Sequence, residues 1–172
     1  MLGPADLGGM WGKSTMYEAS AGIPMIMAGP GVPRGTVCAT PVTLLDAFPT
    51  YVQCMGATPA ASDATLPGVS LYDIANGLVP KRTVLSEYHA AASITGASMI
   101  RHGRYKYVHY VGLPPMLFDL QADPYERTDL GRDAQYAAVI AECVSALRKV
   151  VDPDAANRNA RQRCAATTTA NC

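Results

Sequence analysis

Histidine, cysteine and acidic side chains are the residues best suited to chemistry, and in this chain they are scattered. The three histidines, His89, His102 and His109, are not spaced as paired metal ligands on a helix, and Asp and Glu form no metal-binding cluster. The sequence contains no Walker-type phosphate loop, no G-x-G-x-x-G after a strand, no G-x-S-x-G and no H-E-x-x-H. The general catalytic motifs therefore assign no activity.

The cysteines point to a reducing environment. There are five, far apart and without a C-x-x-C pair, which argues against a zinc ribbon or a redox motif. An odd number is typical of free thiols, and residues 1–11 lack the basic opening and apolar block of a secretory signal. We expect a cytoplasmic protein, with a disulfide between Cys164 and Cys172 as the alternative for the end of the chain.

The composition predicts a folded, globular chain. The 172 residues are 49% hydrophobic and 16% charged, with 14 Lys+Arg against 14 Asp+Glu. Balanced charge argues against nucleic acid as a partner, and no apolar run approaches the roughly 20 residues of a membrane span. We therefore expect neither nucleic-acid nor membrane binding. The length is about that of one domain.

In the first half of the chain we expect one strand and short helices. The apolar run Pro24–Ala28, closed by G-P-G-V-P-R-G, predicts a buried strand that ends in a turn. Thr40-Pro41, followed by apolar residues at three- and four-residue intervals from Leu44 to Met55, predicts an amphipathic helix. Pro49 should bend or divide that helix. A helical turn is expected around 71–75.

The second half changes to a strand pattern. Strands are predicted over 82–89, 97–101, 104–110 and 116–120, and the short loops between them favour an antiparallel sheet. Asp133 is predicted to cap a helix whose apolar stripe, from Tyr136 to Val151, would cover one face of the sheet. The cations Arg101, Arg104 and Lys106 predict a charged hairpin edge.

A series of motifs runs through the chain in a fixed order. The first, Gly9–Ser20, is G-M-W-G-K-S-T-M-Y-E-A-S, followed by I-P-M-I-M-A-G-P-G-V. The others are T-P-V-T-L-L-D-A-F-P-T, L-P-G-V-S-L, L-S-E-Y-H-A, R-H-G-R-Y-K-Y, P-P-M-L-F-D-L-Q-A-D-P-Y-E-R-T-D-L and V-V-D-P-D-A. Together they resemble the sulfatases, formylglycine-dependent sulfate-ester hydrolases of the alkaline phosphatase superfamily, particularly choline-sulfatase-like and phosphonate-monoesterase-like members.

The resemblance implies an α/β fold, with α+β character in the second half. Residues 1–80 would be the C-terminal remnant of the sulfatase α/β domain, and residues 81–152 a small subdomain of four antiparallel strands and a long helix. Residues 153–172 contain three arginines but no acidic residue beyond Asp154 and no large aliphatic or aromatic side chain. We expect them to be an extended or disordered tail.

The resemblance also implies roles for three residues. Lys13 of W-G-K matches the family's active-site lysine, whose ammonium stabilises negative charge on the bridging oxygen as the S–O bond breaks. The alternative is a solvated lysine on a glycine-rich loop. His89 and Glu87 of S-E-Y-H match a segment that faces the substrate pocket, where they could select the alcohol part of the ester. The alternative is a strand-end histidine bonded to its neighbours.

The remaining parts of the family's active site have no match. The nucleophile is a cysteine converted to formylglycine, and Cys38, in C-A-T-P, is the nearest but has the wrong context. Asp6 lacks the D-H-G or D-N-G context of a family metal ligand. We therefore expect no cofactor in this chain, calcium or another divalent metal in the complete family enzyme, and no activity from the chain alone.

Three functions remain open. The first is the C-terminal portion of a sulfuric ester hydrolase, which would take a small sulfate ester once its pocket is completed. The second is a non-catalytic binding or oligomerisation module, with a homo-oligomer formed through the tail. The third, from the same superfamily, is part of a phosphonate or phosphate ester hydrolase.

Overall fold

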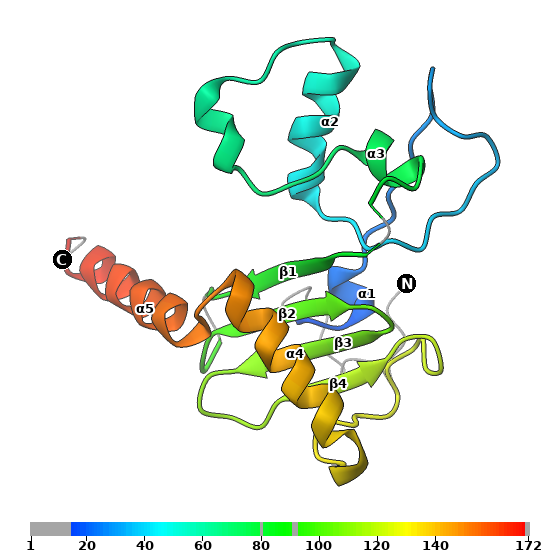
Figure 1. Cartoon of the computed structure of the whole chain (residues 1–172). Helices are drawn as coiled ribbons and strands as arrows, with labels where there is room; N and C mark the ends of the chain where they lie inside the picture. The colour runs from blue at the N-terminus through cyan, green and yellow to red at the C-terminus, as the bar shows by residue number, and fades with distance from the viewer. Residues whose placement is uncertain (1–14, 80, 91–92, 171–172) are drawn as a thin grey trace. The chain divides into compact units, whose positions relative to one another are not determined.

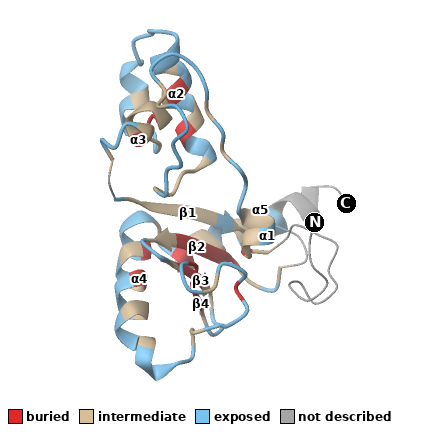
Figure 2. Cartoon of the chain, turned by 90° about the vertical axis from the view of Figure 1, so that its right-hand side faces the viewer, coloured by how far each residue is buried: buried red, intermediate tan, exposed pale blue. Residues whose placement is uncertain are grey.

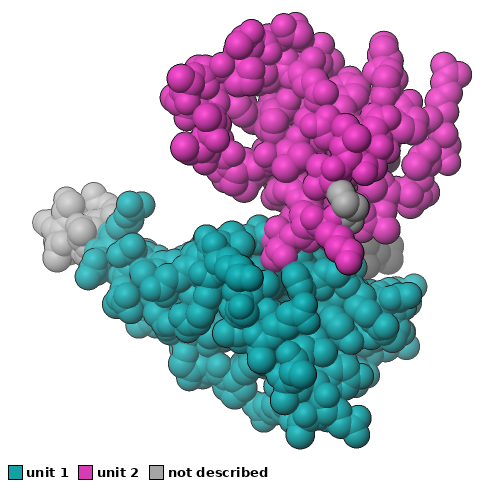
Figure 3. Space-filling view, in the orientation of Figure 1, with its two compact units in different colours: residues 1–23, 85–172 teal, residues 24–84 magenta. Residues whose placement is uncertain are grey.

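The computed structural model describes residues 15–79, 81–90 and 93–170. They form two compact units: unit 1 comprises Met1–Ile23 and Leu85–Cys172, and unit 2 comprises Pro24–Val84 (Figure 3). The sequence analysis expects a boundary after residue 80, and the two units divide between Val84 and Leu85. Of the residues before Pro24, the described ones, 15–23, belong to the same unit as the sheet of the second half.

Unit 1 is built on a four-stranded sheet (Figure 1). Its strands are β1 (Thr83–Tyr88), β2 (Ala97–His102), β3 (Tyr105–Tyr110) and β4 (Met116–Asp119), in the order β1-β2-β3-β4. β3 lies between β2 and β4 and is antiparallel to both, with Tyr107 opposite Ile100 on one side and Leu117 on the other. The predicted antiparallel sheet is confirmed.

A long helix covers one face of this sheet. The short 3-10 helix η3 (Ala134–Tyr136) leads into α4 (Ala137–Val150), and the Asp133 carboxylate accepts a hydrogen bond from the Gln135 amide at 2.8 Å, as a cap does. Cys143 and Leu147, one turn apart on α4, pack against strand residues Ile100, Tyr107 and Leu117. This is the covered face that the apolar stripe predicts, and Figure 2 shows the buried strands beside α4.

The other face is covered by the chain around the short helix α1 (Glu18–Ala21). Met16 is buried there and packs with Ala97, Met99 and Val108 of β2 and β3. The Tyr17 ring lies 5.7 Å from that of Phe118 in β4. Because alternate residues of a strand point to opposite faces, Val108 faces this layer while Tyr107 faces α4.

The C-terminal tail is helical, so the expectation of an extended or disordered tail is wrong. Helix α5 spans Pro153–Ala170. An Asp152 carboxylate oxygen accepts hydrogen bonds from the amides of Asp154 and Ala155, at 3.0 and 3.2 Å. A capped start, proline at the first position and a run of alanine, arginine and glutamine favour helix even without an apolar stripe.

Unit 2 contains short helices: η1 (Leu44–Asp46), α2 (Ala47–Cys54), η2 (Ala61–Thr65) and α3 (Leu71–Ala75). The predicted helix is therefore present in two pieces, but it starts after Thr43 rather than after Thr40. Pro49 is the third residue of α2, within the first turn, where backbone N–H groups have no intrahelical partner. The proline is tolerated there.

The strand predicted at Pro24–Ala28 is absent. These residues have no regular secondary structure, and Ile26 is 90% exposed. A strand requires a neighbouring strand for its backbone hydrogen bonds, and unit 2 as described contributes none to residues 24–28. The apolar composition alone was therefore a misleading signal.

Candidate functional site

Lys13, the catalytic residue implied by W-G-K, lies outside the described residues. The later part of the same motif is described, and it includes Met16, Tyr17 and Glu18. These residues lie against the sheet of unit 1, where the carbonyl of Met16 accepts a hydrogen bond from Lys106 Nζ at 2.8 Å. The motif is thus tied to the sheet at its C-terminal end.

Lys106 is buried in the middle of the sheet, so its expected place at a charged hairpin edge is wrong. Its side chain is 1% exposed. Nζ lies 2.6 Å from Glu18 Oε1 and 2.7 Å from Glu126 Oε1. A buried ammonium needs partners of this kind, since an unpaired charge is expensive to remove from water.

Glu126 completes this cluster from the turn after β4. Its second oxygen, Oε2, accepts a hydrogen bond from the Glu18 backbone amide at 2.5 Å. The backbone of Glu126 has a φ of 53°, in the left-handed region that few residues other than glycine adopt. We call Lys106, Glu18 and Glu126 the Lys106 cluster.

The predicted substrate-binding residues are brought together at the end of β1. His89 Nε2 lies 3.2 Å from Glu87 Oε1, and the Ser98 hydroxyl donates to the same oxygen at 3.3 Å. His89 Nδ1 is buried and has no hydrogen-bond partner. The histidine is thus oriented through Nε2, and Nδ1 is enclosed beside Gly96.

A pocket of about 600 Å³ lies beside His89 and is lined in part by α5, through Asn157 and Arg161. Asn157 Oδ1 accepts a hydrogen bond from the Gly96 amide at 2.9 Å. A Cβ atom on Gly96 would lie 2.6 Å from His89 Nδ1, so only glycine leaves room for the ring. The supposed tail therefore helps to shape the surroundings of His89.

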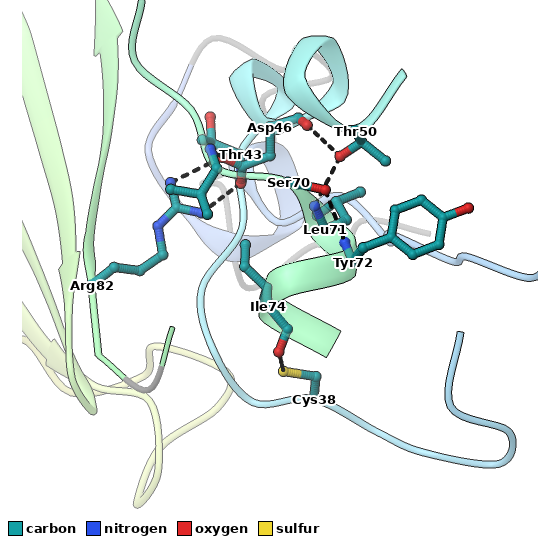
Figure 4. A network of polar contacts seen from close by, with 10 residues as sticks. Cys38, Thr43, Asp46, Thr50, Ser70, Leu71, Tyr72, Ile74 and Arg82 are labelled. Carbon is teal, nitrogen blue, oxygen red and sulfur yellow. Dashed lines mark hydrogen bonds and ion pairs between the residues drawn. The ribbon is translucent and has the colours of Figure 1, made fainter. Parts of the chain in front are cut away.

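Unit 2 has its own buried charge, the Asp46 network (Figure 4). Asp46 is completely buried and accepts two hydrogen bonds from Arg82, at 2.7 and 3.0 Å. It also accepts from the backbone amides of Thr43, at 2.8 Å, and Val69, at 2.9 Å. Burial alone would raise the pKa of Asp46, but these hydrogen bonds and the Arg82 charge hold it below its ordinary value.

The Asp46 network joins two of the family-like motifs, since Asp46 and Val69 belong to T-P-V-T-L-L-D-A-F-P-T and L-P-G-V-S-L. Gly68 of the second motif has a φ of 126°, and a Cβ there would lie 2.4 Å from the Leu45 carbonyl oxygen. Both oxygens of the Asp46 carboxylate accept hydrogen bonds, which leaves no site for a ligand. We assign the network a structural role.

The described residues do not fit a divalent metal. No group of three or more His, Cys, Asp or Glu side chains gathers among them in a way that could hold one. The most buried carboxylates are already paired with cations: Glu126 with Lys106, Asp46 with Arg82, and Asp119 with Arg104. The same part of the chain contains no helix long and apolar enough to cross a membrane.

The fold and the motifs define a sulfatase-type C-terminal region. Residues 8–152 match the family described as N-sulphoglucosamine sulphohydrolase, C-terminal, and the chain belongs to this family. The resemblance to sulfatases inferred from the motifs is thereby confirmed, as is the fold class.

Individual relatives agree with this assignment. The choline-sulfatase of Rhizobium meliloti is 39% identical over 125 residues, which cover 73% of this chain and 24% of the relative. A candidate sulfatase structure from Bacteroides thetaiotaomicron has a TM-score of 0.53 at 33% identity, covering 61% of this chain and 23% of its own. The phosphonate monoester hydrolase of Silicibacter pomeroyi has a TM-score of 0.53 at 25% identity, and the match covers 69% of this chain and 26% of the hydrolase. This chain spans about a quarter of the length of the curated relatives it matches.

Sequence reasoning missed the residues that hold the site together. Lys106, Glu126 and Gly96 were not recognised as such, although Lys106 and Glu126 both lie in family-like motifs. The one available signal was the position of Lys106 on a strand between two tyrosines, with Val108 on the same face. A lysine in that pattern on a central strand must find buried partners.

Proposed function

We propose that this chain is the C-terminal portion of a sulfuric ester hydrolase whose nucleophile and metal ligands are encoded outside it. The observation that carries the proposal is the attachment of Met16–Glu18 to the sheet through Lys106. This attachment gives the W-G-K motif a fixed base, which a solvated loop lysine would not need. The 39% identity to a choline-sulfatase supports a sulfate ester as substrate.

In this proposal Lys13 stabilises the leaving oxygen. Negative charge develops on the bridging oxygen as the S–O bond breaks, and an ammonium group in a water-poor pocket lowers the energy of that state. The complete enzyme would carry calcium or another divalent metal, but the described carboxylates are not its ligands. Because no segment of the sequence matches the family's nucleophile or metal-ligand motifs, we expect the chain alone to be inactive.

His89 and Glu87 are proposed to contact the alcohol part of the ester. The Glu87 carboxylate would favour an alcohol that carries positive charge, such as choline, which the name of the Rhizobium meliloti relative indicates for that protein. The His89 ring, oriented by Glu87, would line the neighbouring pocket. Replacing Glu87 with Gln should then weaken the preference for a cationic over a neutral sulfate ester.

A chimera tests the proposal. The full chain replaces the matching C-terminal region of the Rhizobium meliloti choline-sulfatase, which supplies the remaining active-site residues. We expect release of sulfate from choline sulfate, and loss of that release on the order of a hundredfold or more in Lys13→Ala. A folded, metal-loaded chimera without hydrolysis would contradict the proposal, as would full activity of Lys13→Ala.

The isolated chain provides the complementary measurement. With an aryl sulfate and calcium we expect no turnover above a Lys13→Ala control. Turnover that depends on Lys13 would show that the chain carries a complete site of its own.

Hydrolysis of a phosphonate ester is the second candidate, favoured by the likeness to the Silicibacter pomeroyi phosphonate monoester hydrolase. Both reactions place charge on a leaving oxygen, so Lys13 would serve either. The chimera distinguishes them when it is assayed in parallel with a sulfate ester and a phosphonate monoester of the same alcohol. We expect the sulfate ester to be the better substrate.

The third function, an assembly module, would use α5 as an oligomerisation surface. Light scattering of the full chain and of a chain that ends at residue 152 tests it. A fall in oligomer size beyond the lost mass would support assembly through α5, and unchanged stoichiometry would exclude it.

A further inference from the structure

The Lys106 cluster differs from an ordinary buried ion pair in the number and origin of its bonds. An ammonium group has three N–H donors. Lys106 Nζ has three oxygen neighbours: it donates a hydrogen bond to the Met16 carbonyl and forms ion pairs with Glu18 and Glu126. Two of the three belong to residues 16–18, the end of the segment that carries Lys13. Without that segment the ammonium would lose its hydrogen bond to the Met16 carbonyl and its ion pair with Glu18.

Glu126 fixes the same segment by a second route. It contacts Lys106 through Oε1 and accepts the Glu18 backbone amide through Oε2. Its side chain is 2% exposed, so it has little freedom to turn away to water. Lys106 on β3 and Glu126 in the turn after β4 thus hold one short stretch of backbone, residues 16–18, from two places.

Apolar contacts also hold residues 16–18 against the sheet, but they fix the position of this segment less sharply than the polar contacts do. Met16 packs with Ala97, Met99 and Val108, and the Tyr17 ring packs near Phe118. Hydrophobic contact is non-directional, whereas charge-assisted hydrogen bonds fix both distance and direction. An apolar side chain at position 106 would serve packing equally well without the cost of burying charge. The lysine therefore calls for an explanation beyond packing.

We propose that the Lys106 cluster positions Lys13 for catalysis by fixing the backbone of residues 16–18. The inference rests on the proposed function of Lys13. Lys13 lies three residues before Met16, so the two α-carbons are separated by at most about 10 Å of extended chain. A shift at the anchored end is passed on to Lys13 over that short distance. Lys106 and Glu126 are positioning residues in this scheme, and they do not touch the substrate.

Glu18→Gln tests the anchor in the full chain. Replacing Lys106 would leave two carboxylates unpaired and threaten unit 1 as a whole, whereas the Glu18 side chain is 41% exposed and tolerates an amide. We expect amide hydrogen exchange of residues 16–22 to accelerate on the order of tenfold, with β2 and β3 nearly unchanged. The matched control is Glu142→Gln on α4, which loses a 3.2 Å contact to His102.

The inference would be overturned if amide exchange at residues 16–22 were no faster in Glu18→Gln than in Glu142→Gln. That result would leave the proposed function unaffected. Equal acceleration throughout unit 1 would also overturn it, because the cluster would then stabilise the fold in general rather than this segment.

The chimera then tests whether the anchor acts through Lys13. We expect Glu18→Gln to lower kcat on the order of tenfold with little change in KM, and Glu142→Gln to leave both unchanged. In a Lys13→Ala background Glu18→Gln should cause no further loss. An equal loss in both backgrounds would overturn the positioning role. A parent chimera without sulfatase activity would instead overturn the proposed function, and the inference with it.

Discussion

The two units bury charge in opposite ways. In unit 1 the buried group is a cation, Lys106. Two of its partners, Met16 (90 residues distant) and Glu18, come from far away in the sequence, and the third, Glu126, comes from the turn after the next strand. In unit 2 the buried group is a carboxylate, Asp46, and its partners lie 3, 23 and 36 residues away, at Thr43, Val69 and Arg82. The first arrangement joins distant segments, and the second closes local loops.

The partners also differ in their access to water. Glu126 is 2% exposed in its side chain, whereas Arg82 is 13% exposed and carries its charge on a long stem. When the central group is removed, Arg82 can turn towards solvent and Glu126 cannot. A buried charge is therefore more costly to disturb in unit 1 than in unit 2.

The largest effect is expected for Lys106→Met. Methionine has a similar length and keeps the packing, but it leaves Glu18 and Glu126 without their cation, and a broken buried ion pair of this kind costs about 3–5 kcal/mol. Hydrogen exchange of the β2 and β3 amides should report this loss of unfolding free energy. Arg104→Met, which removes the more exposed partner of Asp119, is the control and should cost much less. Equal effects would abolish the contrast between buried and exposed pairs.

Asp46→Asn should cost less, about 2–3 kcal/mol. The amide keeps one acceptor for the backbone of Thr43 or Val69 but loses the bidentate pair with Arg82. Exchange of the amides in α2 and α3 measures the effect. Asp63→Asn serves as the matched control. The Asp63 carboxylate accepts a hydrogen bond from the Ala60 amide at the start of another helix, in a more exposed position. A loss larger than that of Lys106→Met would reverse the comparison.

Acid should destabilise unit 2 through the same carboxylate. The pKa of Asp46 is lowered in the folded chain, so its stabilising contribution is complete above the unfolded value, near 3.8, and is lost as pH falls through the lower folded value. Exchange of the α2 and α3 amides between pH 5 and 2.5, corrected for intrinsic rates, should show this loss. Asp46→Asn should flatten the dependence. Unchanged steepness in the variant would assign the acid sensitivity to other groups.

The smallest effect, about 1–3 kcal/mol, is expected for Gly96→Ala, which tests crowding rather than charge. The added Cβ would meet His89 Nδ1 at 2.6 Å and Asn157 Oδ1 at 3.0 Å. The NMR signals of the His89 imidazole should move as the ring is displaced. Asn157→Ala removes the acceptor of the Gly96 amide without adding bulk and separates the two causes. An unmoved ring in Gly96→Ala would show that His89 is not held by this contact.

The sheet and α4 could be predicted because each leaves a local pattern. Alternation along β3 separates Tyr107 from Val108, short loops force antiparallel pairing, and the Cys143–Leu147 spacing marks the covered side of α4. Lys106 was misjudged because the residues that cover its face precede it by about 90 positions, and no local pattern refers to them.

Other errors have equally specific causes. The run Pro24–Ala28 has strand composition, but no neighbouring strand is present to pair with it. Helix α5 lacks an apolar stripe, and its start depends on the cap at Asp152. In the sequence Asp152-Pro153 was interpreted only as the end of the preceding helix, so the cap was not recognised. His89 and Glu87 were placed together by their spacing on one strand, whereas their neighbour Gly96 depends on a contact with α5.

The long separation within the Lys106 cluster has a consequence for the order of events during synthesis. Residues 24–84 leave the ribosome before Lys106 does, so every partner of Asp46 is available before the Lys106 cluster can form. Met16 and Glu18 emerge before unit 2, yet Lys106 follows Met16 by 90 residues and Glu126 follows Glu18 by 108. Pairing across such distances is slow because a long loop must close. Met16 and Glu18 are therefore made well before their partners and complete their contacts late.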